Sequence, residues 1–181
     1  TFNSLEILKR YYALDWFNAG DKDLATHIYR TDLLRKGFSK SEATKKICEK
    51  LGVRAEVIPM CNENVETYIE IPSAKIHFEE YYIKYGCKPK ILNVEFRGIK
   101  KAKPTHGVIE LIKKASKVII CPSNPVVSIG TILQVKGIKT ALKNEREKVY
   151  AISPIVKGAT IKGPADKLLE NQGFDVSCLG V

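Results

Sequence analysis

The chain has 181 residues, 44% of them hydrophobic, which is typical of a globular protein and excludes a disordered one. Lysine and arginine number 30 against 20 acidic residues, and the net charge of +10 favours anionic partners. No apolar run approaches the ~20 residues of a membrane span, and no zinc-finger spacing or RNP-like motif indicates a nucleic-acid binder. We therefore expect a cytoplasmic protein with a phosphate-bearing substrate and with neither nucleic acid nor membrane as a partner.

The five cysteines are widely spaced and form no CxxC pair, which argues against a zinc knuckle. Their odd number favours a reducing cytoplasm. We expect most of them to be small core residues: Cys48, Cys61, Cys87, Cys121 and Cys178.

Both ends of the chain interrupt a pattern. TFNSLEILKRYY begins inside a helical repeat, and DVSCLGV stops on an apolar run. We therefore expect a single α/β domain over residues 1–181 that is incomplete at both ends.

The first fifty residues have the spacing of three helices. Residues 2–12 carry apolar side chains at helical intervals. Residues 21–36 form the second predicted helix, which Gly37 ends. Ser39 and Glu42 then form a capping box for the third helix.

Between about residues 54 and 98 the apolar period becomes that of strands. The clearest case is Val65–Ile71, which alternates apolar and polar side chains. We predict an antiparallel insert of four strands, at residues 56–58, 65–71, 76–82 and 91–96. The alternative for the third is that HFEEYYIK is helical.

From Pro104 onward, short apolar runs alternate with helical patterns, which indicates a parallel sheet covered by helices on both faces. The predicted strands are 117–120, 149–152 and 176–181, and the predicted helices are 108–115, 129–142 (interrupted at Gly137) and 164–172. In such sheets, ligands bind at the carboxyl ends of the strands.

The loop Pro122–Pro125 lies at the carboxyl end of a predicted strand. Ser123 and Asn124 offer side-chain donors, and the following helix is expected to offer free N–H groups at residues 126–128. This pattern predicts an anion site. The alternative is that Ser123 only caps the helix.

A second strand end repeats this arrangement at Ser153–Pro154. Lys162, just before the next predicted helix, is expected to reach the same edge of the sheet. A solvated loop lysine is the alternative.

The stretch WFNAGDKDLATHIYRT crowds Asp21 and Asp23 into the start of a helix. Such carboxylates can hold Mg²⁺ together with phosphate oxygens. The alternative is a helix-capping aspartate. His27 shares a face with Asp23, but without a second histidine it makes a poor zinc ligand.

Three stretches together resemble the CofD family of 2-phospho-L-lactate transferases: GDKDLATHIYRTDLLRKGFS, CPSNPVVSIGTIL and ISPIVKGATIKGPADKLL. The pattern P-M-x-x-x-x-V-E-T-x-I at residues 59–69 and H-F-x-E-Y at residues 77–81 also fit. The resemblance covers essentially all 181 residues.

The resemblance implies a three-layer α/β/α fold with a mainly parallel, Rossmann-like sheet, and a homodimer. It implies transfer of a 2-phospholactyl or phosphoenolpyruvyl group from a guanosine diphosphate-linked donor to the deazaflavin Fo. GMP is released in this step of coenzyme F-420 biosynthesis, and Mg²⁺ is required. The family also has segments before Thr1 and after Val181, and we expect the active site to be incomplete without them.

The resemblance also implies roles for particular residues. Asp21 and Asp23 are the expected catalytic residues, and Asp21 is also the expected metal ligand. Asn18 and His27 are expected to contact Fo. The expected nucleotide and diphosphate ligands are Ser123, Asn124, Ser128, Ser153 and Lys162.

Two other functions remain open. A related group with the same fold binds nucleotide sugars and regulates carbon use or cell shape, without known transfer chemistry. The stretch GDKDLATHIYRT resembles the transferases rather than those regulators. An RNA-binding function rests on the net charge of +10 alone.

Overall fold

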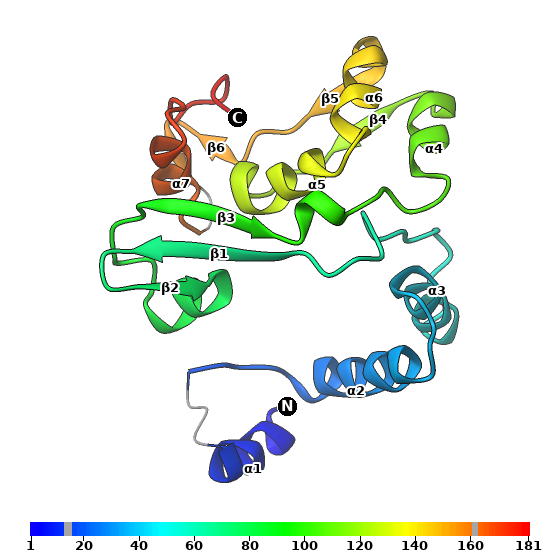
Figure 1. Cartoon of the computed structure of the whole chain (residues 1–181), viewed down its shortest axis with the longest axis vertical. Coiled ribbons are helices and arrows are strands. Elements are labelled where there is room, and N and C mark those ends of the chain that lie inside the picture. The colour runs from blue at the N-terminus through cyan, green and yellow to red at the C-terminus, as the bar shows by residue number, and fades with distance from the viewer. Residues whose placement is uncertain (13–15, 161–162) are drawn as a thin grey trace. The chain divides into compact units, whose positions relative to one another are not determined.

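The structure is a computed structural model that describes residues 1–12, 16–160 and 163–181. It divides into two compact units, Thr1–Asn62 and Glu63–Val181 (Figure 1). The prediction of a single domain stays a prediction. Across the described ranges, no helix has both the length and the apolar character that crossing a bilayer requires.

The first unit contains the three predicted helices: α1 (Asn3–Tyr12), α2 (Asp21–Arg35) and α3 (Lys40–Lys50) (Figure 1). Helices α2 and α3 pack through a small buried cluster against which two aromatic side chains lie. The cluster is Leu33, Ala43 and Ile47, covered by Tyr29 and Phe38.

The predicted capping box at the start of α3 is confirmed. The Glu42 carboxylate accepts a hydrogen bond from the Ser39 N–H at 2.7 Å, and the Ser39 hydroxyl accepts one from the Glu42 N–H at 3.3 Å. This pair satisfies N–H groups that a helix start otherwise leaves without partners, and it sets where α3 begins.

In the second unit, the insert is a three-stranded antiparallel sheet in the order β2-β1-β3 (Figure 1). Its strands are β1 (Glu66–Ile71), β2 (Ala74–His77) and β3 (Asn93–Arg97). The predicted strand at residues 56–58 is wrong: Val57 is exposed, so its apolar side chain buries nothing that would stabilise a strand there.

The predicted strand at residues 76–82 ends early. The chain leaves β2 at His77 and enters a π-helical segment, Glu80–Lys84. This turn buries Tyr81 completely, and its hydroxyl donates to the carbonyls of Cys87 and Pro89 at 3.2 and 3.0 Å. Burial raises the pKa of Tyr81 to about 12.

The α/β class is confirmed. Strands β4 (Val118–Ile120) and β5 (Val149–Ala151) pair in parallel. The other strand pairs within the described ranges are antiparallel. The helical segments of this half are α4 (Val108–Lys114), α5 (Thr131–Gln134), α6 (Ile138–Asn144) and α7 (Ala165–Asn171), the π-helical Pro125–Gly130, and the 3₁₀ turns Ile99–Lys101 and Arg146–Lys148.

Two details of this half differ from prediction. A short hairpin, β6 (Ile155–Val156) and β7 (Ala159–Thr160), follows β5. Residues 176–181 form turns and not a strand, because the Ser177 hydroxyl accepts from the Gly180 N–H at 3.0 Å and curls the chain on itself.

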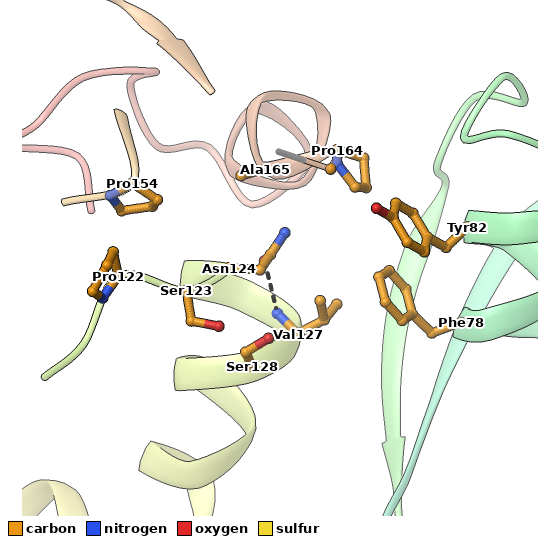
Figure 2. Close-up of a pocket in the computed structure, with 11 residues that line it drawn as sticks. Phe78, Tyr82, Pro122, Ser123, Asn124, Val127, Ser128, Pro154, Pro164 and Ala165 are labelled. Atoms are coloured by element: carbon orange, nitrogen blue, oxygen red, sulfur yellow. Dashed lines mark hydrogen bonds between the residues drawn. The ribbon is translucent and has the colours of Figure 1, made fainter. Parts of the chain in front are cut away.

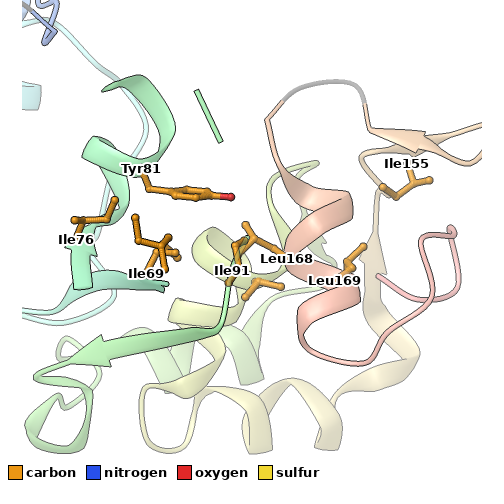
Figure 3. Close-up of a cluster of buried hydrophobic side chains, with 9 residues drawn as sticks. Ile69, Ile76, Tyr81, Ile91, Ile155, Leu168 and Leu169 are labelled. Carbon is orange, nitrogen blue, oxygen red and sulfur yellow. The ribbon is translucent and has the colours of Figure 1, made fainter. Parts of the chain in front are cut away.

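The main core of the second unit joins the insert to the α/β half. It takes side chains from all three strands or their flanks, from both π-helical segments, and from β6 and α7 (Figure 3). These buried residues are Ile69, Ile71, Ile76, Tyr81, Ile91, Val126, Ile155, Leu168 and Leu169. Because they form one cluster, the insert packs against the π-helical segment Pro125–Gly130 and against α7.

The cysteines only partly match the predicted core role. Cys61 is buried, and Cys87 packs half-buried against the core. The prediction is wrong for Cys121 and Cys178, which are exposed. The Cys178 thiol lies 3.1 Å from the carbonyl oxygen of Ile155, so a hydrogen bond rather than burial holds it.

Gly98 allows a close approach of two backbone segments, and substitution tests this. Gly98 and Gly107 both have left-handed backbone, with φ of 82° and 87°. A Cβ at Gly98 would lie 2.0 Å from the Asn64 carbonyl oxygen, whereas one at Gly107 meets nothing within 4 Å. We expect Gly107→Ala to lower the free energy of unfolding by about 1 kcal/mol, and Gly98→Ala by at least ~1 kcal/mol more. Equal losses in urea denaturation would contradict this packing.

Candidate functional site

A pocket of about 350 Å³ in the second unit lies at the carboxyl end of β4 (Figure 2). Four segments that are distant in sequence line it, and its described lining residues carry no charge. They are Phe78, Tyr82, Pro122, Ser123, Asn124, Val127, Ser128, Pro154, Gly163, Pro164 and Ala165. The predicted position, at a strand end beside the Pro122–Pro125 loop, is therefore where the structure has its pocket.

Asn124 organises the loop. Its Oδ1 accepts hydrogen bonds from the N–H groups of Val126 and Val127, at 3.0 and 3.1 Å. Figure 2 shows the bond to Val127. The Asn124 carbonyl accepts from Ser128 at 3.2 Å. The prediction of free N–H groups at residues 126–128 is therefore wrong, because the asparagine that precedes them satisfies all three.

The helix cap is therefore Asn124 and not Ser123, the candidate considered from the sequence. Ser123 and Ser128 both line the pocket (Figure 2). With the N–H groups occupied, a ligand at this loop would be held by side-chain donors: two hydroxyls and the Asn124 amide nitrogen, which points away from the helix (Figure 2).

Ser153 does not join this group. The Ser153 hydroxyl accepts from the Ile155 N–H at 3.1 Å, which fixes the turn between β5 and β6, while its neighbour Pro154 lines the pocket. Lys162 lies outside the described residues. Ser153 thus shapes the site through Pro154.

The opposite wall was not predicted. Phe78 and Tyr82 stack on one another, with ring centroids 5.9 Å apart and an angle of 6° between the planes (Figure 2). The sequence signal for this wall is in the stretch HFEEYY, where Phe78 and Tyr82 are four residues apart. As a strand it would send both rings to the same face of the insert, whereas the π-helical turn brings them to the pocket.

Four predicted site residues lie in the first unit, around the start of α2. Asp21 accepts hydrogen bonds from the Thr1 hydroxyl and from the Ser4 N–H, the latter at 3.1 Å. These bonds, that from Thr1 most strongly, hold the pKa of Asp21 below its ordinary value. Asp21 therefore fastens the start of α1 to the start of α2.

Asp23, Asn18 and His27 are exposed. Asp23 accepts from the Gly20 N–H at 3.2 Å, which is the capping role considered as an alternative. The Asn18 side-chain oxygen accepts from Lys9 Nζ at 3.1 Å, and both line a groove of about 390 Å³.

In the part of the chain that the structure describes, no three His, Cys, Asp or Glu side chains gather as a metal site would require. A magnesium ion needs less from a protein, since one or two carboxylates plus substrate phosphates are its usual ligands. Each Asp21 carboxylate oxygen accepts one hydrogen bond and has a second lone pair, which meets that lesser requirement.

Comparison with known proteins gives a consistent result. The family profile described as "2-phospho-L-lactate transferase CofD" matches residues 4–178. A Methanosarcina acetivorans protein named 2-phospho-L-lactate transferase is 38% identical over 181 residues, which are 100% of this chain and 58% of that protein. A Streptomyces coelicolor protein named phosphoenolpyruvate transferase is 38% identical over 186 residues, again 100% of this chain and 58% of that protein. The chain thus spans less than two thirds of these relatives.

Two crystal structures of a UPF0052-family protein from Bacillus halodurans share the fold. One has a TM-score of 0.52 at 23% identity, covering 64% of this chain and 37% of that one. The other has a TM-score of 0.54 at 22% identity, covering 76% and 43%. At such identities the likeness supports the α/β fold alone.

Substitution of Asn124 separates its capping role from its role in binding. Asn124→Ala removes the acceptor for Val126 and Val127 and should lower the free energy of unfolding by about 1 kcal/mol. Asn124→Asp keeps that acceptor and should be as stable as the unaltered protein. Thermal or urea unfolding of the two variants measures this, and an alanine variant of unchanged stability would contradict the capping.

The Asp21 carboxyl should titrate below its ordinary pKa of 3.8. Since the folded pKa is depressed, the tether between α1 and α2 is fully present above the unfolded pKa and is lost as pH falls through the folded pKa. Carbon-13 NMR of the carboxyl measures this directly. Thr1→Ala, which removes the largest cause, should move the pKa back toward 3.8; no movement would show that this hydrogen bond does not act on Asp21.

Proposed function

This chain belongs to the CofD family, and from that premise we propose that the complete protein transfers a 2-phospholactyl or phosphoenolpyruvyl group to the deazaflavin Fo. The donor is linked to guanosine diphosphate: the lactyl or enolpyruvyl group is attached to its terminal phosphate, and that phosphate is transferred with it. The reaction serves coenzyme F-420 biosynthesis. The observation that carries the proposal is the 38% identity to a 2-phospho-L-lactate transferase along all 181 residues of this chain.

The proposed step is a displacement at phosphorus. The terminal ribityl hydroxyl oxygen of Fo bonds to the phosphorus that bears the lactyl or enolpyruvyl group. The bond from that phosphorus to the bridging oxygen breaks, GMP leaves with the bridging oxygen, and the hydroxyl proton passes to a base. Such reactions need positioning and charge neutralisation more than covalent help from the protein.

The Pro122–Pro125 loop has suitable groups for holding the phosphates. Ser123, Ser128 and the Asn124 amide nitrogen are three donors converging on one pocket. Because the N–H groups at the helix start are occupied, these side chains supply the proposed contacts. Lys162, in the third family-like stretch ISPIVKGATIKGPADKLL, is proposed to add positive charge.

The first unit supplies the proposed acidic groups. Asp21 would hold Mg²⁺, which neutralises phosphate charge when bound, and Asp23 is proposed to act beside it. Asn18 and His27 are proposed to contact Fo, and the protein is proposed to act as a homodimer. The exposure of Asp23, Asn18 and His27 leaves them accessible to a substrate.

The test is turnover by the complete protein, measured as GMP release with each donor type in the presence of Fo and Mg²⁺. Calorimetry with GDP, UDP and a UDP-sugar accompanies it. We expect GMP release with one donor type and tighter binding of GDP than of UDP. Tight UDP-sugar binding without GDP binding or turnover would contradict the proposal and favour a nucleotide-sugar-binding regulator.

The same calorimetry tests the loop. Asn124→Asp keeps the cap but replaces a donor by a negative charge, so it should weaken GDP binding about 10-fold or more, ~1.4 kcal/mol. Because Asn124→Asp preserves the helix cap, a loss of GDP affinity in this variant does not result from unfolding. GDP affinity equal to that of the unaltered protein would show that the loop does not hold the phosphates.

A further inference from the structure

We propose that Phe78 and Tyr82 form an aromatic wall that stacks against the flat heteroaromatic ring of a substrate, while the hydroxyl-bearing loop opposite takes its polar chain. The inference rests on the proposed function, because guanosine diphosphate and the deazaflavin are both a flat ring joined to a polar chain. It adds the site for the ring, which none of the predicted residues provides.

The wall consists of two parallel rings. Phe78 and Tyr82 are stacked with 5.9 Å between centroids and 6° between planes, and both line the pocket. Figure 2 shows them on one side of the pocket, with Pro122 and Pro154 on the other side and Asn124 between. Offset parallel rings at this spacing are the arrangement that a further aromatic ring can extend.

The backbone is unusual at this wall and at the loop that faces it. The structure describes two π-helical segments, Glu80–Lys84 and Pro125–Gly130, and both line the pocket, through Tyr82 and through Val127 and Ser128. Such segments are rare and are frequently found at functional sites. Gly130 permits the second one, since a Cβ there would lie 2.9 Å from the Pro125 carbonyl oxygen.

The chemistry of the lining favours a ring that carries no charge. None of the described lining residues is charged, and most of them are apolar or aromatic. The polar groups gather on the Ser123–Ser128 loop, across from the aromatic pair (Figure 2). A pocket of about 350 Å³ with one apolar wall and a few converging donors suits a small ligand with a flat end and a polar end.

The wall is also well supported. Phe78 packs against the main core, next to the buried Tyr81. Tyr82 is in contact distance of Gly163, where an added Cβ would lie 3.7 Å from the tyrosine ring. A rigid pair of rings loses little conformational freedom when a ligand stacks on it.

The test compares tyrosine and phenylalanine variants of the complete protein in binding to GDP and, separately, to Fo. Tyr82→Leu and Phe78→Leu remove a ring but keep apolar bulk, and Tyr82→Phe keeps the ring. Tyr68→Leu is the matched control: Tyr68 belongs to the same insert, but it stacks under Arg97, 3.6 Å from the guanidinium carbon, and does not line the pocket. Thermal unfolding and circular dichroism check the fold; if Phe78→Leu fails to fold, Tyr82→Leu decides.

We expect Tyr82→Leu and Phe78→Leu to weaken the stacked ligand about 10-fold or more, within the range for a lost ring stack. Tyr82→Phe should bind this ligand more tightly than Tyr82→Leu does. Tyr68→Leu should bind it with the affinity of the unaltered protein. The ligand that weakens identifies the ring, guanine or deazaflavin. Unchanged affinity for both ligands in both leucine variants overturns the inference.

Turnover of the unaltered protein separates this inference from the proposed function. Ring-dependent binding without turnover supports the aromatic wall and contradicts the transfer reaction. Turnover with affinities that do not depend on Phe78 or Tyr82 supports the reaction and overturns the wall. Binding of neither GDP nor Fo by the unaltered protein overturns both.

Discussion

The pair of hydrogen bonds from Val126 and Val127 to the Asn124 side chain is the constraint on which the pocket depends. It begins the π-helical segment at Pro125, after the loop that follows β4, so that Val126 enters the main core while Val127 and Ser128 face the pocket. The prolines on either side of Ser123 and Asn124 restrict the loop further. The bonds that start this helix therefore also hold the surface that lines the pocket, and the proposed phosphate contacts are made by side chains.

The main core positions the Phe78 and Tyr82 side of the pocket. One cavity is lined by residues from four parts of the sequence, within 78–82, 122–128, 154 and 163–165. They meet because the insert and α7 share buried side chains with the π-helical segment Pro125–Gly130. Tyr81 links them most clearly: it is fully buried, and its neighbours Phe78 and Tyr82 are left facing the cavity. The insert therefore serves as part of the site as well as of the fold.

Local signals in the sequence predicted what local interactions determine. The Ser39 capping box, the break at Gly137 and the strand end before Pro122 depend on residues a few positions apart, and all three are present. The local pattern left residues 77–84 open between a strand and a helix. The burial of Tyr81 among distant side chains favours the helical turn at residues 80–84. The free N–H groups were wrongly expected for a related reason: Ser123 and Asn124 are both good caps, and the sequence does not say which side chain turns back.

The most direct measurement is a crystal structure of the complete protein with GDP, Fo and Mg²⁺. The account predicts a ligand ring within about 4 Å of Phe78 or Tyr82, with the polar chain of the same ligand toward Ser123, Asn124 and Ser128. GDP and Fo both bound elsewhere, with this pocket unfilled, would contradict it.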